Sequence, residues 1–117
     1  MKLYHYPACS TCRKASSFLK SLSVEVESIH IVNNPPSEAE LLAVAKQIPG
    51  GAKKLFNTSG EVYRELELKD LLPSMSEDEM VRLLSQHGKL IKRPLLVGDN
   101  VALVGFNEAE WRASLAS

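Results

Sequence analysis

Cys9 and Cys12 are the residues of this sequence whose type and spacing most directly indicate chemistry. Two residues separate them, and the chain has no other cysteine to pair with either. An apolar run at 3–6 precedes the pair and a segment with helical periodicity follows it, and a C-x-x-C motif in that setting is typical of thiol redox sites. A helix start presents unpaired N–H groups and partial positive charge, which favour a reactive thiolate. The second cysteine would lie one turn further on, near enough to form a disulfide.

Three other interpretations of the pair remain open. A structural zinc site usually needs four ligands, and only His5, His30 and His87 could complete one, at no zinc-finger spacing. A structural disulfide across so short a loop would constrain the unfolded chain little. The two cysteines could also be inert core residues. Redox or nucleophilic use is the favoured hypothesis, and no metal is expected.

Length and composition bound the class of protein. The 117 residues are 44% hydrophobic, which suits one compact domain over 1–117. The formal net charge is zero, so no global field favours direct binding to nucleic acid or to an anionic membrane. No apolar stretch approaches the ~18 residues of a membrane span, and the N-terminus lacks the apolar region of a signal peptide. We therefore expect a cytoplasmic monomer, in a compartment where thiols are kept reduced.

Hydrophobic periodicity and turn residues predict the elements that must position the pair. The expected order is a strand at 3–6, a helix from Cys9 or Ser10 to about Leu22 and a strand at 24–32. Helices beginning after Ser37 and Ser76 follow, with an ambiguous stretch at 63–72 between them, and then a hairpin at 95–104 and a last helix after Asn107. This β-α-β, helical insertion (about 37–89), β-β-α order predicts an α/β, thioredoxin-like fold.

Five short motifs resemble one known family, in order and with its spacing. They are YHYPACSTCRKA at 4–15, NPPS at 34–37, YREL at 63–66, LIKRPL at 90–95 and VGFN at 104–107. Together they cover nearly the whole chain and resemble the ArsC/Spx family, which contains glutaredoxin-linked arsenate reductases and Spx-type redox regulators. The resemblance implies the ArsC/Spx type of the thioredoxin-like fold.

The resemblance also implies roles for the cysteine pair and for one histidine. Cys9 matches the nucleophilic cysteine, which in the arsenate reductases attacks arsenate before glutathione and glutaredoxin complete the cycle. Cys12 matches a serine in those reductases and the second cysteine of the Spx-type proteins. His5 matches a histidine of the reductases, and an imidazolium near Cys9 would favour its thiolate.

Arg93 and Pro94 match the Arg-Pro of the family. The resemblance implies a cis peptide bond there, facing the cysteine loop. Arg93 would then present a planar, permanently charged guanidinium to an oxyanion or thiolate. The residues that flank the cysteines, Ser10, Thr11 and Arg13, complete the expected set of thiolate-tuning or substrate-binding residues.

Two positions depart from the arsenate reductase pattern. Asn57 and Phe106 stand where the reductases have two further arginines around the oxyanion. Because a tetrahedral arsenate dianion needs charge-assisted donors, we do not expect arsenate to be the physiological substrate. Gly51 matches a glycine important for polymerase contact on the Spx side, although a glycine here is also a common helix stop.

Three functional hypotheses follow. The first is a thiol–disulfide oxidoreductase without a bound cofactor, in which Cys9 attacks a small-molecule or protein disulfide and Cys12 resolves the intermediate. Its electrons would come from glutathione and glutaredoxin or from thioredoxin. The second is an Spx-type redox-sensing regulator that binds the C-terminal domain of the RNA polymerase α subunit. The third is a glutaredoxin-linked arsenate reductase.

Overall fold

The computed structural model describes residues 1–115, and the chain divides into two compact units. The first unit is formed by Met1–His30 together with the chain from Arg93 onward, and the second by Ile31–Lys92. The expected helical insertion at about 37–89 lies within the second unit. That the whole chain behaves as one domain stays a prediction.

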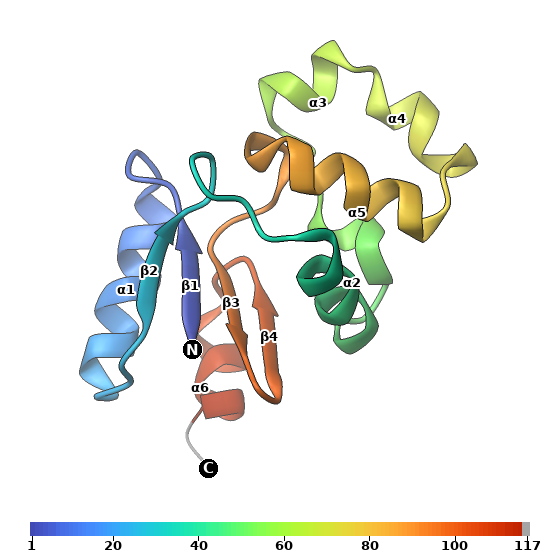
Figure 1. Ribbon diagram of the computed structural model, residues 1–117. Coiled ribbons are helices and arrows are strands. Elements are labelled where there is room, and N and C mark those ends of the chain that lie inside the picture. The colour runs from blue at the N-terminus through green and yellow to red at the C-terminus, as the bar shows by residue number, and fades with distance from the viewer. Residues whose placement is uncertain (116–117) are drawn as a thin grey trace. The chain divides into compact units, whose positions relative to one another are not determined.

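The first unit is built on a four-stranded sheet with the strand order β2-β1-β3-β4 (Figure 1). Strand β1 (Lys2–His5) pairs in parallel with β2 (Glu27–His30) and antiparallel with β3 (Leu95–Gly98), and β3 pairs antiparallel with β4 (Val101–Val104). Helix α1 (Ser10–Ser21) connects β1 to β2, and α6 (Glu108–Leu115) follows β4. This β-α-β and β-β-α arrangement confirms the predicted thioredoxin-like fold.

One apolar cluster fixes both helices of this unit to one face of the sheet. Strand register places Leu3 opposite Leu96 and Leu96 opposite Leu103, so these three side chains share a face. The other buried members are Ala15, Phe18 and Leu19 from α1 and Trp111 from α6. Full burial of such a side chain contributes about 1.5–3 kcal/mol. The cluster therefore fixes the start of α1, and with it the cysteine pair, at the end of β1.

The predicted strand at 24–32 is too long, because β2 has only four residues, Glu27–His30. Ser23 has a left-handed backbone with φ 57°, and the chain is irregular from there to β2. Val24 and Val26 are partly buried against the apolar cluster. The alternating pattern of these valines thus reflects packing on the core and not a strand ladder.

The second unit is helical. Its α-helices are α2 (Glu38–Gln47), α3 (Glu61–Glu65), α4 (Leu68–Leu71) and α5 (Glu77–Gln86), and its 3₁₀ turns are η1 (Gly51–Leu55), η2 (Leu72–Ser74) and η3 (Gly88–Leu90). The ambiguous stretch at 63–72 thus contains most of two short helices, separated by Glu67 in a left-handed conformation with φ 55°. No helix in the described part of the chain is long and apolar enough to cross a membrane.

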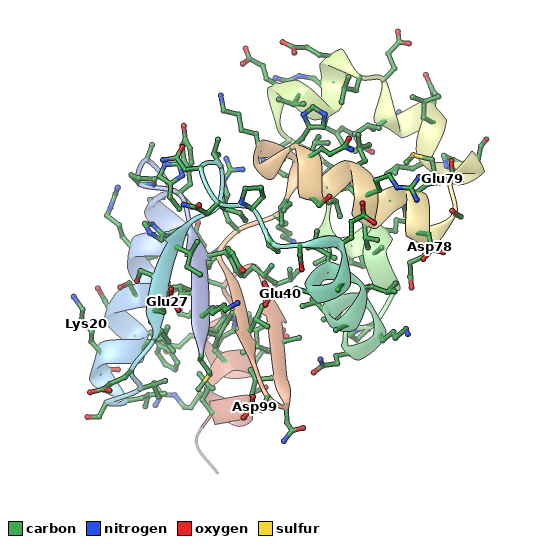
Figure 2. The ribbon with its side chains drawn as sticks, viewed as in Figure 1. Lys20, Glu27, Glu40, Asp78, Glu79 and Asp99 are labelled. Atoms are coloured by element: carbon green, nitrogen blue, oxygen red, sulfur yellow. The ribbon has the colours of Figure 1, made fainter. Side chains whose placement is uncertain are left out.

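Capping residues set the starts of α2 and α5 as predicted. The Ser37 hydroxyl accepts a hydrogen bond from the Glu40 N–H. Ser76 and Glu79 form a complete capping box, and Figure 2 shows Asp78 and Glu79 at this end of α5. The hydrogen bonds from the Ser76 backbone and side chain, in that order, hold the pKa of Glu79 below its usual range. Local sequence is therefore sufficient to start these helices.

Helices α2 and α5 each bury one narrow apolar face. Helix α2 buries Val44 together with Leu41 and Ala45, whereas Leu42 and Ile48 are only half-buried. Helix α5 buries Val81 and Leu84, whereas Met80 and Leu83 are half-buried. Val44 and Ala45 are three and four residues after Leu41, and Leu84 is three after Val81, so the buried residues of each helix share one narrow face.

Candidate active site

Cys9 is the N-cap of α1, and its sulfur lies at the helix start. Its backbone is extended, with φ −91° and ψ 112°, and its N–H donates to the Tyr6 carbonyl at 3.0 Å across the turn that contains Pro7. Its Sγ accepts a hydrogen bond from the Cys12 backbone N–H at 3.2 Å. That N–H is one of the donors that a helix start leaves without an intrahelical partner. A donor in this position stabilises an anionic sulfur more than a neutral thiol.

Cys12 is the buried member of the pair. Only 3% of its surface is exposed, whereas Cys9 is half-buried, and both are free thiols. Burial, assisted by the hydrogen bond with Cys9, raises the pKa of the Cys12 thiol to about 12, although the Tyr6 backbone and the Arg93 charge act in the opposite direction. At neutral pH Cys12 therefore keeps its proton. The pair is asymmetric, with an accessible sulfur at the helix N-terminus and a protonated thiol one turn inside.

Arg93 and Pro94 form a cis peptide bond immediately before β3, as the resemblance implies. The Arg93 guanidinium carbon lies 4.9 Å from the centroid of the Tyr6 ring. Its positive charge reaches the Cys12 sulfur, where it favours the thiolate. Pro94 is buried, and its carbonyl accepts the Gly105 N–H at 2.9 Å. The Arg93 charge is therefore within electrostatic reach of Cys12.

His5 ends β1 and lies opposite His30 in the parallel register. The two imidazole centroids are 6.3 Å apart, and His30 also meets the Tyr6 ring edge-on at 5.6 Å. Sequence reasoning found His5 but missed Tyr6 and His30. The parallel pairing of the first two strands was the available signal for His30, because it aligns the two strand ends.

The other predicted residues form the first turn of α1. Ser10 is exposed, Thr11 is half-buried, and the Arg13 guanidinium donates to the Pro7 carbonyl at 3.2 Å. Arg13 thus fixes the loop that carries Cys9. A depression of about 240 Å³ adjoins Cys12, with His5, Arg13, Ser16 and Ser28 among its polar lining residues. Cys9 does not line it.

Phe106 and Asn57, which stand where the reductases have arginines, are each held by other contacts in this structure. The Phe106 ring lies 5.6 Å from Phe18 and 5.1 Å from Trp111, so it belongs to the packing around the apolar cluster. Asn57 lies in the second unit, where its N–H donates to the Leu90 carbonyl at 2.7 Å. Among residues 1–115, no three His, Cys, Asp or Glu side chains gather as a metal-binding group.

A thioredoxin-like sheet, a cysteine at the first helix N-cap and a cis-proline before the third strand define a class of small thiol-bearing proteins. Residues 4–114 match the ArsC family, and the chain belongs to that family. This membership agrees with the motifs quoted above and confirms the family resemblance.

The relatives of the chain include an uncharacterized protein, a transcriptional regulator and a structure described only by its family. It is 46% identical over 116 residues to the uncharacterized protein YusI of Bacillus subtilis (strain 168), covering 99% of this chain and 98% of that protein. It is 30% identical to the global transcriptional regulator Spx of Streptococcus mutans, covering 97% and 81%. An ArsC family related protein from Bacteroides fragilis has a similar structure, with a TM-score of 0.88, 45% identity and coverage of 97% and 98%. A choice between functions therefore depends on the site.

Proposed function

We propose that this protein is a thiol–disulfide oxidoreductase that uses Cys9 as the nucleophile and Cys12 as the resolving cysteine. The observation that carries the proposal is the asymmetry of the pair. The Cys9 sulfur is accessible and accepts an N–H bond at the helix start, whereas Cys12 is 3% exposed and its pKa is raised by burial. A two-cysteine exchange reaction requires one sulfur that attacks first and one that is held back.

In the first step the Cys9 thiolate attacks one sulfur of a substrate disulfide. A bond forms between Cys9 and that sulfur, the substrate S–S bond breaks, and the other substrate sulfur leaves as a thiolate that takes a proton from water. The N–H of Cys12 would hold the attacking sulfur in place before the reaction. His5 and Arg93 are proposed to favour the thiolate form, and Ser10, Thr11 and Arg13 to shape the loop.

In the second step Cys12 attacks the Cys9 sulfur of the mixed disulfide. Because the Cys12 thiol has a raised pKa, its proton must be lost as the sulfur attacks, and the departing substrate thiolate is the natural acceptor. The products are the second substrate thiol and a disulfide between Cys9 and Cys12. A thiol system of the cytoplasm, either glutathione with glutaredoxin or thioredoxin, is proposed to return two electrons to the pair.

A regulator of the Spx type is the second candidate, because an Spx protein aligns with 97% of this chain. In that case the disulfide would control binding to the C-terminal domain of the RNA polymerase α subunit. Gly51, at the matching position, has a left-handed backbone with φ +68°, and a Cβ there would lie 2.7 Å from the Glu77 carboxylate. The left-handed backbone and the nearby carboxylate thus explain a glycine at position 51 without a contact to the polymerase.

Arsenate reduction is the third candidate and the least supported. Phe106 packs among aromatic rings and Asn57 is uncharged, so neither supplies the cation that an arsenate site requires. We propose that arsenate is not the substrate.

A disulfide-reduction assay on the whole protein tests the proposal. Wild type should reduce a low-molecular-weight mixed disulfide with glutathione and glutaredoxin or with the thioredoxin system as donor, and Cys9→Ser should abolish turnover. Cys12→Ser should trap a mixed disulfide on Cys9, visible by mass spectrometry. Equal activity of wild type and Cys9→Ser would reject the proposal. Arsenate as a substrate, and capture of the polymerase domain by oxidised and reduced protein, separate the other two candidates.

A further inference from the structure

Tyr6 contacts Cys9, Cys12 and Arg93, although the sequence predicted no role for it. Its carbonyl accepts the Cys9 N–H at 3.0 Å, and its backbone is hydrogen-bonded to the Cys12 sulfur. The Arg93 guanidinium carbon lies over the face of the Tyr6 ring, 4.9 Å from its centroid. The Tyr6 and His30 rings form a T-shaped pair with centroids 5.6 Å apart. The backbone of one residue thus touches both cysteines while its side chain touches the cation.

The contact between Tyr6 and Arg93 has a physical consequence for the cation. A free arginine side chain samples many rotamers, and ordering it costs conformational entropy. The negative face of an aromatic ring attracts a guanidinium and so restricts where its charge lies. Because the Arg93 charge reaches the Cys12 sulfur, its electrostatic effect on the cysteine pair depends on that position.

We propose that Tyr6 is a positioning residue whose ring holds the Arg93 guanidinium where its charge stabilises the reduced cysteine pair. The inference deepens the proposed function and rests on it, since it concerns the same pair. Only the aromatic face is required, so phenylalanine should replace tyrosine, whereas an aliphatic side chain should not. In the proposed function Cys9 carries the negative charge of the reduced pair, because Cys12 keeps its proton, and the two cysteine side chains are hydrogen-bonded to each other. A positive charge beside that thiolate stabilises the reduced form, and displacing the charge should make the pair harder to reduce.

The test is a double-mutant cycle on the reduction potential of the cysteine pair, measured in glutathione buffers. We expect Tyr6→Leu to shift the dithiol–disulfide equilibrium toward the disulfide by about 3- to 10-fold, where tenfold corresponds to about 30 mV. Tyr6→Phe should stay within about twofold of wild type, since it keeps the ring face. Arg93→Met should produce a similar shift, and Tyr6→Leu should add nothing in the Arg93→Met background.

Two results would overturn the inference. Additive shifts in the double variant would mean that Tyr6 does not act through Arg93, and an equal effect of Tyr6→Phe and Tyr6→Leu would mean that the ring face is not the cause. A second readout is the alkylation rate of Cys9 in a Cys12→Ser background, which should fall by about threefold with Tyr6→Leu and not with Tyr6→Phe. If wild type forms no reversible disulfide, the proposed function fails, while this alkylation series still decides whether Tyr6 positions Arg93.

Discussion

The Cys9→Ser variant leaves Cys12 as the only thiol and allows its protection to be measured directly. Burial raises the pKa of Cys12 from an ordinary 9.0 to about 12. At about pH 8 this lowers the thiolate fraction by ~1000-fold relative to an unfolded cysteine. A thiolate of higher basicity is intrinsically more nucleophilic, which recovers about 20- to 30-fold. The full shift corresponds to alkylation of Cys12 ~30-fold slower in the folded protein than in the unfolded chain, before its 3% exposure slows it further. Cys9→Ser removes the part of the shift that Cys9 contributes, so in this variant the slowing caused by the pKa alone is smaller than ~30-fold.

Iodoacetamide labelling followed by mass spectrometry measures this ratio, with the same variant in urea as the unfolded reference. Because the Cys9→Ser substitution leaves Cys12 in the same buried place, burial, the largest cause of the pKa shift, is retained. The control is Cys12→Ser, in which the accessible Cys9 should label rapidly in the folded protein. A folded rate for Cys12 within about threefold of the unfolded rate would refute the reasoning, since burial and the raised pKa would then be absent.

The same thiol predicts a loss of stability at alkaline pH. Between 9.0 and about 12 the folded protein keeps the Cys12 proton while the unfolded chain releases it. The contribution is thus fully present below the unfolded pKa and is lost as the pH rises, by about 1.4 kcal/mol per pH unit. In urea unfolding, the free energy of unfolding of Cys9→Ser should fall more steeply with pH than that of Cys9→Ser/Cys12→Ala, because lysine and tyrosine titration is common to both variants. An equal dependence on pH in the two variants would contradict this prediction.

Two further predictions concern stability. Gly88→Ala would place a Cβ against the Ile31 carbonyl and should lower the free energy of unfolding by about 1–3 kcal/mol. The control is Gly98→Ala, which should cost less because its Cβ meets a flexible methionine side chain. Equal losses of stability in urea denaturation would show that the backbone at Ile31 does not exclude a side chain at position 88. Trp111→Phe removes the Nε1–H donor to the Gly105 carbonyl at 2.9 Å and should cost about 1–3 kcal/mol by thermal denaturation, so an unchanged midpoint would show that this bond contributes nothing.

Much of the first unit could be predicted because its signals are local. The C-x-x-C motif after an apolar strand located Cys9 at the helix start, and the hairpin before the last helix followed from turn residues. The cis bond before Pro94 came from the family resemblance. Serine caps located the starts of two helices of the second unit. Each of these features is encoded within a few consecutive residues.

What the sequence did not predict depends on contacts between distant segments. Tyr6 and Arg93 lie far apart in the chain, and only the pairing of β1 with β3 brings their segments together. His30 joins the same cluster through the parallel register with His5. The length of β2 was overestimated because Val24 packs on the core from an irregular segment with the same alternation that a strand would show. Hydrophobic periodicity indicates which side chains are buried, but it does not indicate which segment of the chain they pack against.

The reduction potential of the wild-type pair tests the central claim most directly. Full-length protein is equilibrated in buffers of reduced and oxidised glutathione, trapped by acid and resolved by mass spectrometry. The asymmetric pair predicts one reversible disulfide between Cys9 and Cys12, with a midpoint of ~−200 to ~−300 mV, and a glutathione adduct confined to Cys9 in Cys12→Ser. Two permanently free thiols, or an adduct on Cys12 in place of Cys9, would contradict the account.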